Sequence, residues 1–225
     1  KADYVFIEST YGDRLHPPIE ERKRELIRII NETYKRGGRL MIPSFAVERA
    51  QEILYLIGEF MQEGLIPKMK VFLDSPMAMK ATEVFAKYTE YYNNYIQKSM
   101  KKRKDPFNFP GLAYTRSVEE SKRINGINEP CIVIAGNGMC TGGRIKHHII
   151  NNIQNQKNTL LLVGYQVEGT LGYWLKKGEK KIDLLGVNVQ VKSKIESIEG
   201  FSAHADYNGL IEWLNDFSPK PKKVF

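Results

Sequence analysis

Near-continuous apolar runs that alternate with helix-like segments constrain the fold of this chain more than any other feature. Four such runs lie at residues 39–43, 69–73, 131–135 and 159–163. Segments with helical periodicity follow them at about 46–63, 77–88, 144–153 and 169–177. Strands that are apolar on both faces and alternate with helices are typical of parallel sheets covered on both sides. The pattern therefore predicts an α/β fold with a doubly wound, mostly parallel sheet over roughly 37–178.

The beginning of this core carries recognisable start and stop signals for helices. Apolar residues at helical spacing predict an amphipathic helix over about 19–36. Gly37 and Gly38 follow it, and glycine is the usual residue after a helix end. Ser44 stands where it would cap the helix expected from about 46.

The flanks of the core have a different pattern. Apolar and polar residues alternate through 182–198, which predicts antiparallel, half-exposed strands rather than buried parallel ones. Short strands are expected at 4–7 and at the C-terminal end, with a helix at about 207–216.

The net charge indicates what kind of partner the chain binds, and the cysteine content indicates the cellular compartment in which it works. The 225 residues include 34 Lys and Arg against 26 Asp and Glu, a formal net charge of +8. This excess favours a polyanionic partner, nucleic acid first, although a lysine-rich surface that serves solubility fits the charge as well. No apolar run approaches the roughly 20 residues of a membrane span. Cys131 and Cys140 do not make a disulfide framework, which fits a reducing, cytoplasmic location.

Three strand ends of the predicted sheet lead into loops suited to phosphate binding. Ligands of open parallel sheets bind where strands end and helices begin, and backbone N–H groups there attract anions. The candidate residues are Ser44 and Arg49 in the first loop, Ser75 in the second, and Thr141, Gly142, Gly143 and Arg144 in the third. Each loop alone is also explained as a simple turn, so the case rests on all three in a basic protein. The third loop begins like a dinucleotide fingerprint, but Thr141 replaces the last glycine.

A hydroxyl, an imidazole and a carboxylate fall within residues 200–206. Ser202, His204 and Asp206 would share one face of a strand, and small neighbours leave the imidazole ring accessible. A serine-hydrolase triad is disfavoured because triad members converge from distant segments and the chain has no nucleophile elbow. No His- or Cys-rich metal motif is present, so we expect no metal site built by this chain alone.

The other histidines and Cys140 point to packing rather than chemistry. His147 and His148 are adjacent on a predicted helix, where their side chains diverge and cannot easily chelate one ion. A helix-packing or surface role is expected for them, and a packed thiol for Cys140. His16 lies in a predicted loop and receives no role.

Six motifs, spread over nearly the whole chain, resemble those of one family. They lie at residues 8–13, 42–49, 74–78, 138–144, 164–172 and 201–206. In this order they resemble the β-CASP group of metallo-β-lactamase-fold nucleases. The match is closest to its bacterial and archaeal RNA-processing members, which are related to the endonuclease subunit of the cleavage and polyadenylation factor. The resemblance adds Gly169 and Thr170 to the candidate substrate-binding residues.

The resemblance implies both a domain arrangement and a catalytic pair. Residues 13–178 would form a β-CASP domain, with 1–12 and 179–225 as edges of a metallo-β-lactamase-fold domain. Glu8 and His204 would lie beside a two-zinc centre, with His204 near the scissile phosphate and Ser202 hydrogen-bonded to that phosphate. A histidine held by a carboxylate can stay protonated and stabilise developing charge on a phosphate. The family's zinc-ligand motifs have no match here, so the zinc ligands are expected mostly outside this chain.

The implied function is the RNA-binding, substrate-cleft portion of a zinc-dependent ribonuclease that hydrolyses RNA phosphodiester bonds in processing or decay. The expected partner is single-stranded RNA, and a homodimer of the full-length protein is compatible with the resemblance. The chain alone is expected neither to bind the zinc pair nor to cleave RNA. Two alternatives stay open: a non-catalytic RNA-binding module, and a Rossmann-like nucleotide-binding module unrelated to the family.

Overall fold

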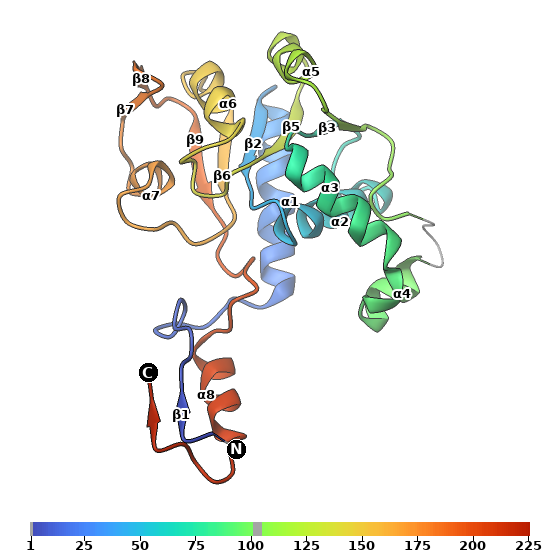
Figure 1. The fold of residues 1–225 in the computed structure, drawn as a ribbon. Helices are drawn as coiled ribbons and strands as arrows, with labels where there is room; N and C mark the ends of the chain where they lie inside the picture. The colour runs from blue at the N-terminus through green and yellow to red at the C-terminus, as the bar shows by residue number, and fades with distance from the viewer. Residues whose placement is uncertain (1, 101–104) are drawn as a thin grey trace.

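The chain folds into a large α/β unit and a small unit that holds both chain ends (Figure 1). The computed structural model describes residues 2–100 and 105–225. Two segments of chain run side by side between the units (Figure 1). Because the first and last parts of the sequence meet there, residues far apart in the chain come together between the two units.

The large unit is built on one six-stranded parallel sheet. Its strands, in spatial order, are β4 (Leu112–Tyr114), β3 (Lys70–Leu73), β5 (Cys131–Ala135), β2 (Arg39–Pro43), β6 (Thr159–Leu162) and β9 (Lys194–Ser197). Every pairing between neighbours is parallel. The central strands β2, β5 and β6 are buried along their whole length, as their continuous apolar sequences predict. The predicted doubly wound, mostly parallel sheet is confirmed.

Helices cover both faces of this sheet. One face packs on α1 (Ile19–Lys35), α2 (Arg49–Gln62) and α3 (Pro76–Lys87). The other face packs on α6 (Ile145–Asn152) and α7 (Leu171–Lys176), with α5 (Val118–Arg123) and a short 3-10 turn (Ile124–Gly126) at the β4 end. Alternate residues of a strand pack into the hydrophobic cores on opposite faces of the sheet. In β2, Leu40 and Ile42 face α1 and α2, whereas Met41 faces α6. A second 3-10 turn (Thr89–Tyr91) and α4 (Asn94–Met100) extend beyond α3 (Figure 1).

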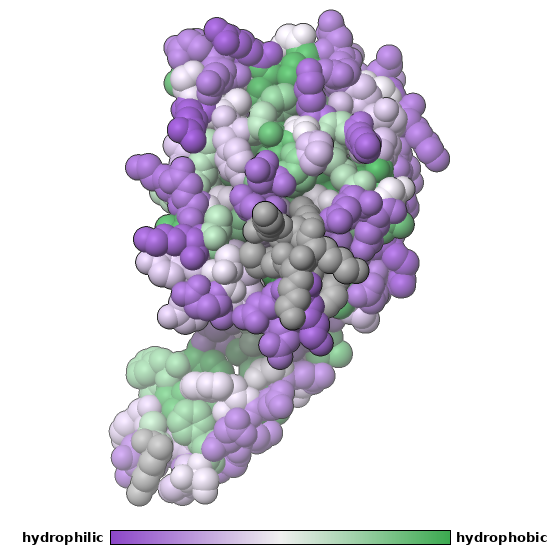
Figure 2. Space-filling model, turned by 90° about the vertical axis from the view of Figure 1, so that its right-hand side faces the viewer, coloured by the Kyte–Doolittle hydropathy of each residue, from purple (hydrophilic) through white to green (hydrophobic). Residues whose placement is uncertain are grey.

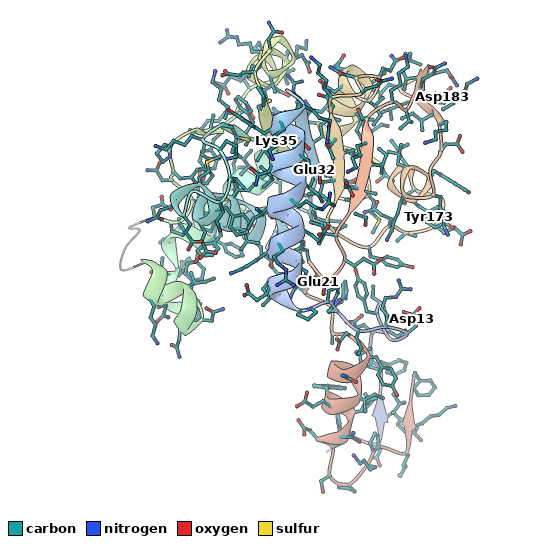
Figure 3. All side chains as sticks on the ribbon, turned by 180° about the vertical axis from the view of Figure 1, so that it is seen from behind. Asp13, Glu21, Glu32, Lys35, Tyr173 and Asp183 are labelled. Carbon is teal, nitrogen blue, oxygen red and sulfur yellow. The ribbon has the colours of Figure 1, made fainter. Side chains whose placement is uncertain are left out.

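Helix α1 runs along the sheet and ends where the sequence predicts. Its labelled residues Glu21, Glu32 and Lys35 follow the length of the helix in Figure 3, which views the molecule from behind. Gly37 adopts φ +70°, and Gly38 N donates to Thr33 O at 3.0 Å, so the chain turns off the helix here. A Cβ on Gly38 would lie 1.8 Å from Lys157 O, so only glycine fits this turn.

The start of α2 differs from the sequence prediction. The helix begins at Arg49 rather than near residue 46, and Ser44 does not cap it. The Ser44 hydroxyl donates instead to Phe45 O at 3.0 Å. The physical reason is Glu48, whose φ of +69° and ψ of −59° cannot belong to a right-handed helix.

The prediction of antiparallel strands over 182–198 is correct for one hairpin and wrong beyond it. β7 (Lys181–Leu184) and β8 (Val187–Gln190) form an antiparallel hairpin that packs on the α6 face. β9 instead pairs in parallel with β6, as the edge strand of the large sheet. An edge strand is half exposed, and charged side chains from α1 reach β9: Arg28 lies 3.6 Å from Glu196 and Lys194 lies 3.0 Å from Glu32. The alternating sequence of β9 therefore reflects its edge position.

The small unit combines the two ends of the chain. β1 (Tyr4–Val5) pairs in parallel with β10 (Lys223–Val224), and α8 (Tyr207–Asn215) lies beside this pair (Figure 1). Figure 2 shows hydrophobic residues over the surface of this unit. Phe6 is 79% exposed and stacks on Phe225 at 4.8 Å between ring centroids, and Trp213 is 49% exposed. Two strands of two residues leave much of this apolar surface uncovered.

Candidate functional site

The connection between the units brings two sequence motifs into register. Tyr11 and Asp206 form a parallel β-bridge, and Tyr207 N donates to Arg14 O at 3.0 Å. Asp206 also caps α8, because its carboxylate accepts from Gly209 N at 3.0 Å and from His16 N at 3.0 Å. These backbone hydrogen bonds lower the pKa of Asp206, so it stays charged as a helix cap.

Glu8 and His204 form an ion-pair contact across this connection, as the sequence motifs imply. Glu8 Oε2 lies 3.1 Å from His204 Nδ1. Hydrogen bonds from Thr10 N and, on the other carboxylate oxygen, from Ala205 N hold Glu8 in place. The Thr10 backbone hydrogen bond is the main cause that lowers the pKa of Glu8. The charged carboxylate of Glu8 thus orients the imidazole through Nδ1. Within the described residues the other ring nitrogen, Nε2, has no hydrogen-bond partner, so it is available to a ligand.

His16, which has no predicted role, supports the same imidazole-bearing loop. His16 Nε2 lies 2.9 Å from the carbonyl oxygen of His204. Its ring packs edge-on against Tyr11, with 4.6 Å between centroids. Ser202 contributes from the other side, since its hydroxyl accepts from His204 N at 3.2 Å. His16 and Ser202 therefore fix the backbone of His204, and Glu8 fixes its ring.

Phe201 anchors the motif to the large unit. Its side chain is 1% exposed and joins the core formed by α1, α2 and the sheet. The guanidinium groups of Arg22 and Arg49 lie 5.6 Å and 6.0 Å from its ring centroid. Arg22 also donates to Gly200 O. The large unit thus determines the position of Ser202 and His204.

A hollow of about 400 Å³ lies in front of His204. Five of the six sequence motifs contribute to its wall, through the residues Thr10, Tyr11, Phe45, Val47, Arg49, Met139, Tyr165, Val167, Ser202 and His204. The wall residues from the large unit follow β2, β5 and β6, so the hollow lies at the carboxyl edge of the sheet. Arg49 is buried and pairs with Glu52, whose pKa is raised by burial.

A second hollow, of about 360 Å³, continues from the first and shares Tyr11 and Tyr165 with it. Arg14, Lys176 and Lys177 lie among its wall residues together with Tyr173. Cations interleaved with aromatic rings are the combination that binds single-stranded nucleic acid, by phosphate neutralisation and base stacking. Sequence analysis does not identify this group, because its members lie in three separate segments.

The three predicted phosphate-binding loops meet at one edge, but most of their candidate residues do not line the His204 hollow. A Cβ on Gly136 would lie 3.4 Å from Ser75 Oγ and 3.8 Å from Ser44 O, so the three loops are in contact. Ser75 Oγ caps α3 by accepting from Ala78 N, and Thr170 Oγ1 caps α7 by accepting from Tyr173 N. The candidates outside the wall are Ser44, Ser75, Thr141, Gly142, Gly143, Arg144, Gly169 and Thr170. Their binding role stays a prediction.

Arg144 belongs to a buried polar cluster, which we call the Asp74 cluster (Asp74, Ser121, Arg144 and His148). Asp74 Oδ1 accepts from Arg144 at 2.6 Å, and Asp74 Oδ2 lies 2.6 Å from His148 Nε2 and accepts from Ser121 at 2.5 Å. Burial alone would raise the pKa of Asp74, but hydrogen bonds from His148, Ser121 and Arg144 outweigh it and lower the pKa to about 2. Arg144 also donates to Thr115 O at 2.9 Å. The cluster ties the end of β3 to β4, α5 and α6.

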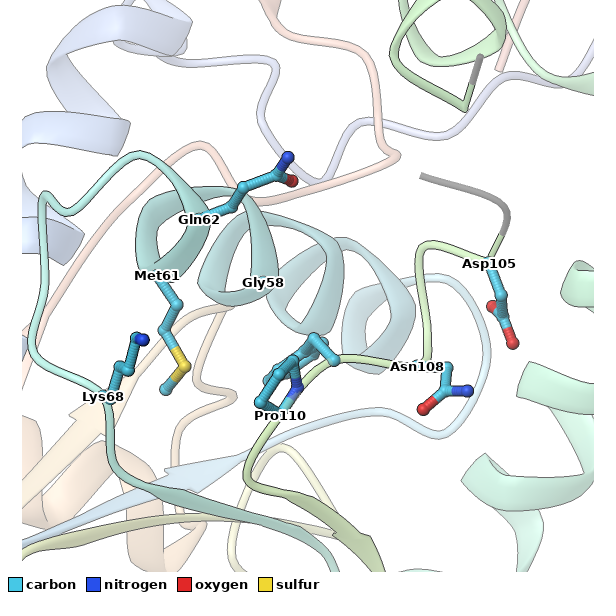
Figure 4. A pocket seen from close by; sticks show the side chains of 8 residues that line it. Gly58, Met61, Gln62, Lys68, Asp105, Asn108 and Pro110 are labelled. Atoms are coloured by element: carbon cyan, nitrogen blue, oxygen red, sulfur yellow. The ribbon is translucent and has the colours of Figure 1, made fainter. Parts of the chain in front are cut away.

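The two cysteines and a further hollow lie apart from the Glu8–His204 pair. Cys131 and Cys140 are free and buried, and burial raises the pKa of Cys140 to about 12, so its thiol stays protonated and packed. Another hollow, of about 470 Å³, lies between α2 and residues 105–110 (Figure 4). Met61, Lys68 and Asn108 line it, and no residue of the His204 hollow does.

Comparison with known families settles what kind of chain carries this site. Residues 50–175 match the family model of the Beta-Casp domain. The chain belongs to the Beta-Casp family. Residues 188–225 of this Beta-Casp chain match a second model, described as a Zn-dependent metallo-hydrolase RNA specificity domain.

Several curated proteins resemble this Beta-Casp chain over nearly its whole length. It is 38% identical to a ribonuclease of Thermus thermophilus over 95% of this chain and 49% of that protein. It is 36% identical to an RNase J-like protein of Methanocaldococcus jannaschii, over 100% of this chain and 51% of that protein. It is 33% identical to the transcription termination factor FttA of Methanosarcina mazei, over 100% of this chain and 36% of that protein. The chain therefore spans about half or less of the length of these relatives.

Because the second family model is described as Zn-dependent, we asked whether the side chains of this chain could hold a zinc ion. Within residues 2–100 and 105–225, no three His, Cys, Asp or Glu side chains gather as a metal site. Glu8 and His204 are engaged with each other. The described side chains of this Beta-Casp chain therefore do not fit a zinc centre by themselves. No helix of the described part is both long and apolar enough to cross a membrane.

Proposed function

We propose that the full-length protein is a ribonuclease and that this chain provides its RNA-binding cleft and part of its catalytic site. The observation that carries the proposal is the Glu8–His204 pair, which opens onto a hollow built from five of the six family motifs. The relatives named as ribonucleases and the RNA specificity model over residues 188–225 support RNA as the substrate.

The geometry suits a role for His204 at a phosphodiester. The Glu8 carboxylate contacts Nδ1 and orients the imidazole, and an N–H at Nε2 can stabilise a phosphate oxygen or protonate a leaving oxygen. Ser202 lies beside it in the wall of the same hollow and offers a hydroxyl. Arg49 adds a cation to the wall of the hollow, partly neutralised by Glu52. These groups bind and orient phosphate, whereas attack by water needs activation from elsewhere.

We propose that two zinc ions supply that activation and that their ligands lie in polypeptide outside this chain. The support is the Zn-dependent description of the model over 188–225, together with the lack of a metal-ligand cluster among the described residues. The exposed apolar surface of the small unit supports the same arrangement. Residues 1–12 and 179–225 would then form edges of a metallo-β-lactamase-fold domain, as the sequence resemblance implies.

Single-stranded RNA is the proposed form of the substrate. The hollow lined by Arg14, Lys176 and Tyr173 combines cations with rings that can stack on unpaired bases. A double-stranded helix keeps its bases stacked on one another, so these rings would have no base faces to contact.

The test is RNA cleavage by the full-length protein and its His204→Ala variant. We expect turnover to fall by about 10²–10⁴, the usual contribution of a general acid, with RNA affinity nearly unchanged. Glu8→Gln should lower turnover less, because the imidazole remains. His147→Ala is the matched control, since His147 is exposed on α6 and outside the hollow. Wild-type turnover in His204→Ala would refute the role, and RNA binding without cleavage by the wild type would favour a non-catalytic module.

A further inference from the structure

A third hollow adjoins the His204 hollow and differs from it in chemistry. Its volume is about 310 Å³, and it shares Glu48 and Ser202 with the His204 hollow. It lies between the N-terminal half of α2 and the segment that carries α4. We call it the α2–α4 slot. A group bound next to the phosphate at His204 would reach it directly.

The inner wall of the α2–α4 slot is apolar and aromatic. Phe85, Tyr92 and Ile96 are partly buried and pack on the core, and Phe107 is 5% exposed. The Tyr92 hydroxyl donates to Phe85 O at 2.7 Å, which fixes the plane of the tyrosine ring. Flat apolar walls of this kind accept an aromatic heterocycle, for which stacking and burial provide the binding energy.

Two side chains that line the slot, Gln51 and Glu48, present acceptor oxygens. Gln51 is 2% exposed, and its amide nitrogen donates to Ala46 O, Ala78 O and Thr82 Oγ1. Its Oε1 has no hydrogen-bond partner in the structure, although the side chain lines the slot. Glu48 lines the slot as well, is exposed, and makes no ion pair within the described residues. Acceptors repel phosphate and require a ligand edge that carries donors.

We propose that the α2–α4 slot binds a guanine base of single-stranded RNA, at a nucleotide next to the scissile phosphate. This inference rests on the proposed function. Guanine presents N1–H and N2–H side by side, and two parallel donors match the two oxygens of one carboxylate, here Glu48. Adenine, cytosine and uracil each offer donors from only one ring or amino nitrogen on that edge. Reading of unpaired bases on their Watson–Crick edge is the common mode of RNA recognition.

The backbone conformation of Glu48 allows its replacement by glycine without new strain. Its φ of +69° is unfavourable for any residue with a Cβ, whereas glycine adopts positive φ freely. Glu48→Gly therefore deletes the acceptor and relaxes the main chain, and Glu48→Gln keeps the shape but replaces one acceptor oxygen with a donor. Glu63→Gln is the matched control, because Glu63 is exposed just beyond the opposite end of α2 and lines none of these three hollows.

The experiment measures binding of the full-length protein to short single-stranded RNAs, with a chelator present so that the RNA stays intact. The RNAs carry guanine, inosine, adenine, cytosine or uracil at each position in turn. At one position we expect guanine to bind on the order of tenfold more tightly than the other three standard bases, with inosine intermediate because it lacks the N2 amino group. Glu48→Gln and Glu48→Gly should reduce this ratio to less than about twofold, and Glu63→Gln should retain it.

The outcomes distinguish failure of the guanine slot from failure of the ribonuclease proposal on which it rests. RNA binding by the wild type without any base preference, or a guanine preference that persists in both Glu48 variants, overturns the guanine slot and leaves the ribonuclease proposal standing. Absence of RNA binding by the wild type overturns the ribonuclease proposal itself. An increase in Tm for Glu48→Gly shows that the variant is folded, so loss of preference in it cannot be ascribed to unfolding.

Discussion

His204 is held by contacts on its ring, its amide and its carbonyl. Glu8 contacts Nδ1, Ser202 Oγ accepts from the backbone amide, and His16 lies on the carbonyl oxygen. Backbone hydrogen bonds hold Glu8, and packing on Tyr11 holds His16. A histidine held in this way loses little entropy when it meets a phosphate, which is the benefit of pre-organisation.

Arg49 and Arg144, both candidate phosphate-binding residues, have different surroundings and should respond differently to removal. Arg49→Ala should weaken single-stranded RNA binding and reduce the slope of log affinity against log salt by about 1, because one phosphate contact is lost. Arg144→Ala should leave that slope nearly unchanged and lower the free energy of unfolding by about 3 kcal/mol, because it leaves the Asp74 carboxylate buried without its cation. Salt titrations of RNA binding and denaturant unfolding separate the two. A reduced salt slope in Arg144→Ala would instead assign Arg144 to the substrate.

The Asp74 carboxylate should make stability depend on pH in the acid range. Its pKa is about 2 in the folded chain and about 4 in an unfolded one. A lowered folded pKa contributes stability above pH 4, about 2 kcal/mol here, which is lost as the pH falls from about 4 to about 2. Denaturant unfolding across this range should show a steeper decline for the wild type than for Asp74→Asn. Equal slopes in the two proteins would contradict the assigned pKa.

At the scale of elements, the Gly-rich loop after β5 is held by the segments that follow β6 and β2. Gln166 donates to Gly138 O at 3.1 Å, and Gly172 N donates to Met139 O at 3.1 Å, so the segment after β6 holds the loop. Phe45, from the loop after β2, lies within 2.9 Å of where a Cβ on Gly138 would be. Close approach between these loops places Met139 in the wall of the His204 hollow.

Two adjacent glycines of this loop provide a matched pair of substitutions. Gly143 has φ +72°, and a Cβ there would lie 2.1 Å from Gly136 O, whereas the nearest atom to a Cβ on Gly142 is 3.7 Å away. Gly143→Ala should lower the free energy of unfolding by more than about 3 kcal/mol, since strain and a backbone clash add. Gly142→Ala should change it by less than about 1 kcal/mol. Thermal unfolding of both variants is the measurement, and similar Tm values would show that the loop relaxes.

At the scale of the whole molecule, three hollows form a continuous series from the α2–α4 slot, past His204, to α7. The slot with Glu48, the hollow with His204 and the hollow with Lys176 are linked by shared wall residues. Their character changes from acidic and apolar, through the Glu8–His204 pair, to basic and aromatic. An RNA strand along this series would place a base, the scissile phosphate and the following nucleotides in chemically different surroundings.

The isolated chain should show binding without catalysis. Because no metal-ligand cluster is present among the described residues, the purified chain should carry no stoichiometric zinc and should not cleave RNA. It should still bind single-stranded RNA, with affinity that falls steeply as salt rises, since phosphate neutralisation releases counterions. Metal analysis tests the expected lack of zinc, and fluorescence anisotropy tests the binding of single-stranded RNA. Two zinc ions per chain would show that the ligands lie within it after all.

The sequence by itself determined the parallel sheet and the end of α1 before Gly37 and Gly38, and its resemblance to a family implied the pairing of Glu8 with His204. These features follow from burial on both faces, from positive φ, and from motif chemistry, all of which are encoded locally or by resemblance. The start of α2 and the place of β9 were decided by tertiary structure, because the strained backbone of Glu48 and the edge position of a strand have no local signature. The same is true of His16, the Asp74 cluster and the basic, aromatic hollow. Their members are distant in the chain, and only packing of the two units and of the sheet edge brings them together.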